Sequence, residues 1–191
     1  EHSLSINPTK TELVLFTRKR KVEGIRAPLL FQKHLQFSES VKYLGITLDK
    51  KLNWSKHIQL KAEKANRAFW QSRRAIGKLW GPSPKAVLWL YTAVIRPMFC
   101  YGAIVWWPRT RLSTTVALLN HVQRLACLAC TGAMRTTPTA VMEALLDLPP
   151  LDLHVREQAI LAFLRLKNKG LLNSRGIEGG YSRILGEAIK R

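Results

Sequence analysis

The chain has 191 residues, a hydrophobic fraction of 47% and six tryptophans, which exclude a disordered protein and suffice for a buried core. Its formal net charge is +19, from 31 basic and 12 acidic residues, and the excess is densest in residues 1–80, which hold 17 of the basic and 6 of the acidic ones. Three cysteines, an odd number, exclude a disulfide framework, so we expect an intracellular location, with nucleus and cytoplasm both open.

So large a positive charge favours a polyanionic partner, either nucleic acid or an anionic membrane surface. The alternative is a charge kept only for solubility, although such charges are usually of mixed sign. The chain begins at Glu1-His2 without a methionine and runs directly into a strand-like stretch. We therefore expect a piece of a longer protein.

Residues 1–52 carry the signals of short strands. Residues 6–11, with Asn7-Pro8 at the start and Lys10 near the end, predict a turn. Residues 11–17 then predict a strand. Residues 29–37 offer two short strands broken around Gln32-Lys33-His34, and residues 41–48 alternate like one further strand. Four consecutive cations follow the first strand, Arg18, Lys19, Arg20 and Lys21. They fit a solvated turn, a phosphate clamp or a nuclear-import patch.

From Trp54 the period changes to that of a helix, which we expect to run to Trp80. Small and apolar residues recur at steps of three and four and predict a buried row: Ala65, Phe69, Ser72, Ile76 and Leu79. A second row at the same steps is basic or polar, and Lys61 stands in line with it: Lys61, Lys64, Arg67, Gln71, Arg74 and Lys78. The first row predicts that the helix docks on a core. The second row predicts a surface, about 25 Å long, for a negatively charged partner.

Residues 81–84 predict a helix stop and a new start, with Ser83 as the cap and Pro84 in the first turn. The apolar run that follows, residues 86–107, holds one charge, Arg96, beside Pro97. A central charge and a proline disfavour a membrane span, so we expect two core helices joined at Arg96-Pro97. Further helices are predicted at 112–131, 138–146 and 151–169, and a linker beyond them.

The residues predict no complete catalytic or metal site. Cys127 and Cys130 have the spacing of a metal pair, but four ligands are needed, and buried free thiols fit the apolar context better. Asp49 ends a strand, as metal-binding aspartates do, yet it stands alone and is better explained as a turn former. The histidines form no local triad.

Four stretches together resemble the reverse transcriptase of non-LTR (LINE-type, jockey-like) retrotransposons: INPTKTELVLF, SVKYLGITLDKKLNWSKHI, the run from AFWQSRR to IVWW, and LACTGAMRTTPTAVMEALLDLPPLDL. The resemblance covers the chain to about Lys169 and matches the back end of that polymerase. It implies that the fingers, the palm and the Asp-Asp motif that binds two Mg²⁺ ions lie ahead of Glu1, so that no cofactor is expected in this chain.

The resemblance also assigns roles to residues. Lys10 corresponds to the lysine of palm motif D, a candidate general acid for the leaving pyrophosphate within a complete polymerase. Without the palm it is a surface lysine. Tyr43-Leu44-Gly45 resembles the primer grip, a tight turn that touches the primer end, and the helices from Trp54 resemble the thumb that closes over the template–primer duplex.

We therefore expect an α+β protein: a small β-rich layer, the remnant of a polymerase palm, followed by a mainly helical thumb. The expected divisions are 1–52 for the palm end, 53–131 for the thumb, 132–170 for a helical connection and 171–191 for a linker. The expected function is that of a polymerase fragment, inactive alone, whose partners are an RNA/DNA template–primer duplex and the parent's fingers and palm, with no membrane. The alternatives are a stand-alone nucleic-acid-binding or protein-interaction module and a peripheral membrane protein.

Overall fold

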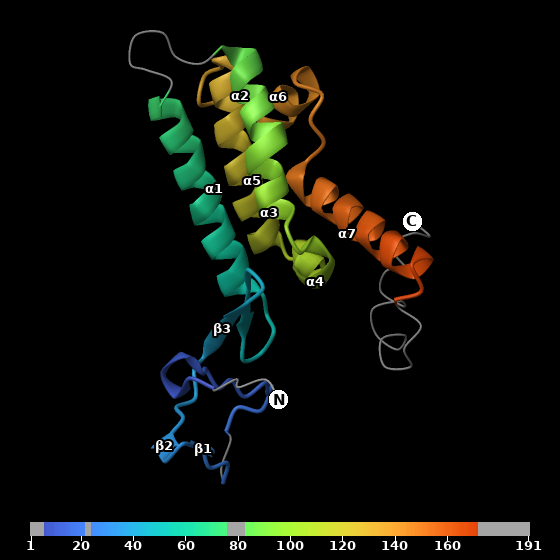
Figure 1. Cartoon of the computed structure of the whole chain (residues 1–191). Coiled ribbons are helices and arrows are strands. Elements are labelled where there is room, and N and C mark those ends of the chain that lie inside the picture. Colours follow the sequence, from blue (N-terminus) through green and yellow to red (C-terminus); the bar gives the residue numbers. More distant parts are fainter. Residues whose placement is uncertain (1–5, 22–23, 76–82, 172–191) are drawn as a thin grey trace. The chain divides into compact units, whose positions relative to one another are not determined.

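The computed structural model describes residues 6–21, 24–75 and 83–171, with only the backbone of residues 73–75. The chain forms two compact units, Glu1–Ile58 and Gln59–Arg191, and their boundary falls inside the long helix α1, Ser55–Ala75 (Figure 1). The expected linker and the end of the predicted basic helix lie outside the described residues. Strands in the first unit and helices in the second fit the α+β class in general.

The first unit contains a short 3-10 helix and two antiparallel hairpins. The helix η1, Pro8–Lys10, is capped by Asn7, whose side chain accepts from the backbone N–H of Thr9. The first hairpin pairs β1, Leu29–Leu30, with β2, Lys33–His34. The second pairs β3, Ser40–Tyr43, with β4, Ile46–Asp49, in the register Ser40 to Asp49 and Tyr43 to Ile46.

The prediction of one continuous strand over residues 41–48 was wrong, because the chain reverses in the middle of it. Leu44 and Gly45 form the turn, with φ values of 45° and 79°. Two successive residues with positive φ are the signature of the tightest hairpin connection, whose twist matches that of the strands. Glycine adopts such a conformation without cost, whereas Leu44 does not. The first hairpin turns in the same way at Phe31-Gln32, where the predicted break around Gln32-Lys33-His34 begins.

The strand predicted over residues 11–17 was also wrong. The segment forms a single bridge, between Leu13 and Phe37, and its other link is a hydrogen bond of 2.9 Å from the Thr17 N–H to the Lys50 carbonyl. A strand needs a neighbour that accepts and donates along its length. Among the described residues this segment has such bonds at isolated points only.

Asp49 ends β4 and holds the turn that leads into α1. Its Oδ1 accepts from the backbone N–H groups of Lys51 and Asn53, each at 3.0 Å, and its Oδ2 from that of Trp54 at 2.9 Å. The expectation of a turn-forming aspartate is confirmed. Close by, the Nδ1 of His57 in the first turn of α1 accepts from the N–H of Thr47 at 3.1 Å and ties the helix start to β4.

In the second unit, a helix begins at Pro84 with Ser83 as its cap, as predicted. It continues as α2, Pro84–Leu90, a π-helical turn η2, Tyr91–Ile95, and α3, Arg96–Cys100. The predicted interruption at Arg96-Pro97 was therefore wrong. The backbone N–H of Arg96 bonds to the carbonyl of Tyr91, five residues back. Such a widened turn re-arranges the bonding ahead of a proline, so the helix continues through it.

The break falls instead at Tyr101-Gly102, where Gly102 has a φ of 70°. Then follow α4, Ala103–Trp106, and the 3-10 helix η3, Trp107–Arg111. The remaining helices are α5, Ser113–Thr131, α6, Thr139–Leu145, and α7, Leu151–Asn168, each close to its prediction. Helix α5 packs on α2, α6 and α7, and α2 and α5 run alongside each other (Figure 1).

Aromatic and aliphatic side chains fill the core of the second unit, among them Tyr91, Phe99, Trp106 and Trp107. A polar network lies within it. The Tyr91 hydroxyl donates to Oε1 of Gln123 at 2.6 Å, and the Gln123 amide donates to Oε1 of Glu143 at 2.6 Å and to the Pro149 carbonyl at 3.0 Å. Gln123 is wholly buried, and its amide thus links α5 to η2, to α6 and to the segment before α7.

Among the described residues, no single helix is long and apolar enough to cross a membrane. The segments Pro84–Cys100 and Ala103–Arg111 reach the required length and apolar character only when taken together, and the chain bends by 54° at the break between them.

We expect Gln123→Ala to lower the free energy of unfolding by about 2–4 kcal/mol, because it leaves a buried hydroxyl and a buried carboxylate without their partner. Denaturant titration would measure the loss. The matched control is His121→Ala, an exposed position two residues away on α5, which should change stability by less than about 0.5 kcal/mol. Equal effects of the two variants would contradict a structural role for the network.

Candidate nucleic-acid interface

Helix α1 buries one face in the second unit and exposes the other. Ala62, Ala65 and Phe69 recur at steps of three and four and are at most 5% exposed. Two of the three are alanines, so the helix backbone can approach its neighbours closely. Burial confirms the predicted row at Ala65 and Phe69, whereas Ser72 is only partly buried. Ile76 and Leu79 lie outside the described residues.

The opposite face carries the basic row. Lys64, Arg67 and Gln71 are exposed and stand on one side of the helix, within roughly 10 Å along its axis. Glu63 lies one turn ahead of Arg67, but no ion pair joins them, and none involves Lys64 within the described residues. The positive charge of this face is therefore not neutralised by the acidic side chains that the structure places.

Lys61 differs from the rest of the row. It is half-buried, its Nζ lies 3.5 Å from the carbonyl oxygen of Met98, and the same atom lies 4.8 Å from the centre of the Tyr101 ring. At 100° per residue, Lys61 stands about 60° from Lys64 toward the buried row. Its ammonium thus contacts the end of α3, which the sequence did not indicate.

The last two candidates of the row are described in part or not at all. Arg74 belongs to the helical backbone of α1, but its side chain is outside the described residues, and so is the whole of Lys78.

The predicted site residues of the first unit lie in three separate segments, and all of them are exposed. Arg18, Lys19, Arg20 and Lys21 follow an extended segment, and the Lys19 N–H bonds to the Thr17 hydroxyl at 3.1 Å. Lys10 ends η1 and is exposed. Tyr43, Leu44 and Gly45 form the tip of the second hairpin, with Tyr43 64% and Leu44 71% exposed. The tight turn expected there from the resemblance is present, but its contact with a primer stays a prediction.

Within the residues that the structure describes, no three His, Cys, Asp or Glu side chains gather to hold a metal ion. Cys127 and Cys130 are buried and free. Burial raises the pKa of the Cys127 thiol to about 12 and that of Cys130 to about 11, so both stay protonated near neutral pH. These cysteines are core residues, in line with the sequence interpretation.

In the sequence, Arg96 was interpreted only as part of a helix interruption. Arg96 lines a pocket of the second unit together with residues of α2 and α7. The signal was present, because Arg96 is the one charge in an otherwise uncharged run of residues 86–107. The opposite wall of this pocket could not be foreseen, since it comes from residues 146–158.

Comparison with known proteins finds relatives of this chain among proteins of transposable elements. The chain is 30% identical over 128 residues to a 115 kDa protein of the type-1 retrotransposable element R1DM of Drosophila melanogaster, covering 67% of this chain and 12% of that protein. It is 27% identical over 157 residues to the Pol polyprotein of element R1 of Nasonia vitripennis, covering 80% and 47%. It is 29% identical over 104 residues to an RNA-directed DNA polymerase of transposon BS of Drosophila melanogaster, covering 54% and 11%.

The chain is thus homologous to proteins of transposable elements. More narrowly, its homologues are Pol polyproteins of type-1 (R1) non-LTR retrotransposons and RNA-directed DNA polymerases of transposons. The chain spans about half or less of the length of these relatives. No family model matches the chain, and no solved structure matches it.

The geometry separates the role of Lys61 from that of its neighbour Lys64. We expect Lys61→Gln to lower the free energy of unfolding by about 0.5–1 kcal/mol, because the ammonium loses the Tyr101 ring and the Met98 carbonyl. Its effect on the salt dependence of duplex binding should be small. The control Lys64→Gln should do the reverse and reduce the slope of log K against log salt by about one. Denaturant titrations and binding isotherms at several salt concentrations measure both, and exchanged results would refute this assignment.

Proposed function

We propose that this chain is part of an RNA-directed DNA polymerase of a non-LTR retrotransposon, and that it grips the template–primer duplex through the exposed face of α1. The observation that carries the proposal is the basic row itself. Lys64 and Arg67 are exposed without acidic partners among the described residues, on a helix whose opposite face is buried. A rigid row of cations is suited to the phosphates of a duplex, which it contacts without reading sequence.

The family relationship supports the polymerase part of the proposal. Relatives named as Pol polyproteins and as an RNA-directed DNA polymerase match between 54% and 95% of the chain. By resemblance, the second unit would contain most of the thumb, predicted over residues 53–131, and the helical connection, predicted over residues 132–170. The parent's fingers and palm would be its partners on the side of the first unit.

The first unit has a place in the same proposal. The exposed hairpin tip at Tyr43, Leu44 and Gly45 would contact the primer end, and Gly45 would let another backbone approach closely. Lys10 would act as a general acid only within the complete polymerase. The cations of residues 18–21 would add phosphate contacts.

The Mg²⁺ ions that such polymerases use find no fitting site in the residues described here. Asp49, the aspartate at a strand end, directs both carboxylate oxygens to backbone N–H groups. No other carboxylates gather with it to hold a metal among the described residues. By resemblance, the metal site would belong to the palm of the parent polymerase.

A second function is supported by a different observation. The first unit exposes several large apolar side chains, including Phe16, Leu29, Phe31 and Leu44, each at least 49% exposed. Such side chains favour contact with protein. The palm of the parent polymerase would cover them in the first proposal, and another protein would do so if the chain acts as a stand-alone interaction module.

The test is the double variant Lys64→Glu, Arg67→Glu, with an RNA–DNA duplex as the ligand. Because two phosphate contacts are lost, the salt slope of duplex binding should fall by about two, and the affinity should drop by at least tenfold at low salt. Both positions are exposed, so the unfolding free energy should change little. Fluorescence anisotropy over a range of salt concentrations measures the effect.

The matched control is Lys167→Glu with Lys169→Glu, which reverses the same number of exposed charges at the end of α7. It should affect binding much less than the α1 variant. Equal losses of affinity in the two variants would mean that overall charge, and not the exposed face of α1, determines binding. Binding without salt dependence, or binding to anionic vesicles alone at physiological salt, would refute the proposal and favour the protein or membrane alternative.

A further inference from the structure

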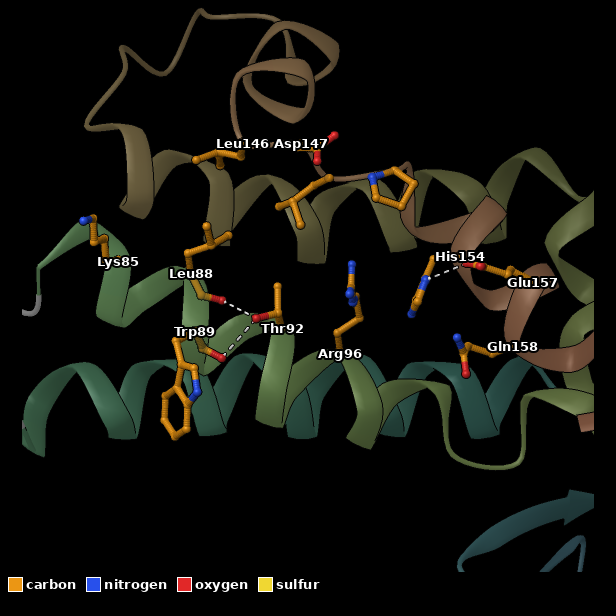
Figure 2. Close-up of a pocket in the computed structure, with 12 residues that line it drawn as sticks. Lys85, Leu88, Trp89, Thr92, Arg96, Leu146, Asp147, His154, Glu157 and Gln158 are labelled. Carbon is orange, nitrogen blue, oxygen red and sulfur yellow. Dashed lines mark hydrogen bonds and ion pairs between the residues drawn. The ribbon is translucent and has the colours of Figure 1, made fainter. Parts of the chain in front are cut away.

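The second unit contains a pocket of about 590 Å³ that the proposed duplex contact does not use. Its floor is one side of the helix formed by α2, η2 and α3, its roof is the segment that joins α6 to α7, and the first turns of α7 close one end (Figure 2). The volume lies within the range of pockets that hold small organic ligands. All of its walls belong to the same unit.

Arg96 lies at the centre of this pocket. In Figure 2 the side chains of Thr92 and Arg96 rise from the floor toward the segment that carries Leu146, and Lys85 lies at the far end. Arg96 is only partly exposed, and its Nε is buried without a hydrogen-bond partner among the described residues. None of the ion pairs within the described residues includes it. The buried Nε thus has no hydrogen-bond partner and the Arg96 charge has no acidic partner among the described residues, so an anion bound in this pocket would supply both.

The acidic side chains around the pocket do not supply that anion. Glu157 Oε2 lies 3.2 Å from Nδ1 of His154, on the side of His154 that Figure 2 shows away from Arg96. Burial and the neighbouring Arg96 charge lower the pKa of His154, so near neutral pH the contact is a hydrogen bond from a neutral imidazole to the carboxylate. Asp147 is exposed and points away from the floor.

The remaining walls indicate the rest of the ligand. Leu88, Leu146, Leu148 and Pro149 provide apolar surface, and Gln158 provides an amide at the α7 end. The pocket is far larger than a phosphate ion needs. A guanidinium matches phosphate oxygens in geometry, and apolar walls beside it suit a sugar and a base. A nucleotide combines these parts, and it is also a unit of the polymer to which a chain of net charge +19 is drawn.

We propose that this pocket binds one unpaired nucleotide of a nucleic-acid strand, with its phosphate on Arg96 and its base or sugar against the apolar wall. The proposal rests on the proposed function in one respect, since the strand is one that continues beyond the duplex held by α1. It assigns to the second unit a second nucleic-acid contact, directed at a single strand.

The experiment compares two ligands on the whole chain by fluorescence anisotropy. One is a blunt RNA–DNA duplex, and the other is the same duplex with a single-stranded extension of about five nucleotides. We expect the extended duplex to bind about tenfold more tightly than the blunt one. Arg96→Gln should remove this preference and leave the affinity for the blunt duplex unchanged.

Two further variants keep the result interpretable if Arg96→Gln alters folding. Lys85→Glu, at an exposed position of the pocket, should reduce the preference at least threefold while the protein stays folded. Arg135→Gln, an exposed arginine that lines neither the pocket nor the basic row of α1, should leave it unchanged. A preference that survives in both pocket variants would overturn the proposal, and so would a wild-type chain that binds both duplexes equally.

The outcomes also distinguish other occupants and the fate of the two proposals. Adenosine monophosphate that binds in an Arg96-dependent way, without any preference for the extension, would make a free nucleotide the ligand and overturn the strand. An acidic peptide that binds in the same way would overturn it in favour of a protein. Failure of all duplex binding refutes the proposed function, whereas salt-dependent binding without preference for the extension refutes the pocket alone.

Discussion

The helical unit depends on a buried amide. Gln123 is the point where α5, the π turn η2, α6 and the segment before α7 are joined by hydrogen bonds, and its side chain is wholly buried. An amide can satisfy Tyr91, Glu143 and the Pro149 carbonyl at once because it both donates and accepts. An apolar core would tolerate sliding of one helix on another, but these directional bonds permit a single arrangement. The roof and floor of the Arg96 pocket are thereby fixed relative to each other.

The same unit shows how a strongly basic helix can be part of a packed protein. The buried side of α1 includes two alanines, Ala62 and Ala65, beside Phe69, so the helix can pack closely there. At the edge of this contact the Lys61 ammonium lies against a carbonyl and an aromatic ring. The remaining cations are exposed, on a helix whose opposite face is packed in the second unit. Because the packed helix sets the spacing of these cations, a phosphate chain meeting this face would have only their side chains to order, which limits the entropic cost of binding.

Most helix boundaries were predictable because their causes are local, and the exception is the boundary predicted at Arg96-Pro97. Ser83-Pro84 starts a helix, Gly132 ends one, and Pro149-Pro150 separates two, each through the conformations of one or two residues. The strand at residues 11–17 failed because pairing depends on a distant neighbour. The alternation of residues 41–48 concealed a turn, since a hairpin keeps the alternation on both of its strands. In the candidate site, spacing gave the exposure of Lys64 and Arg67, but the contacts of Lys61 and Arg96 depend on residues far along the chain.

The π turn at Tyr91–Ile95 has one more consequence. Val87, Tyr91, Ile95 and Phe99 are all buried, and each follows the last by four residues. On an ideal α-helix, a four-residue spacing drifts by about 40° per step, so the fourth member would have left the core by about 120°. The wider turn takes up this drift and keeps the buried side chains in phase. The distortion is therefore visible in the sequence, where the buried residues recur every four residues and not every 3.6.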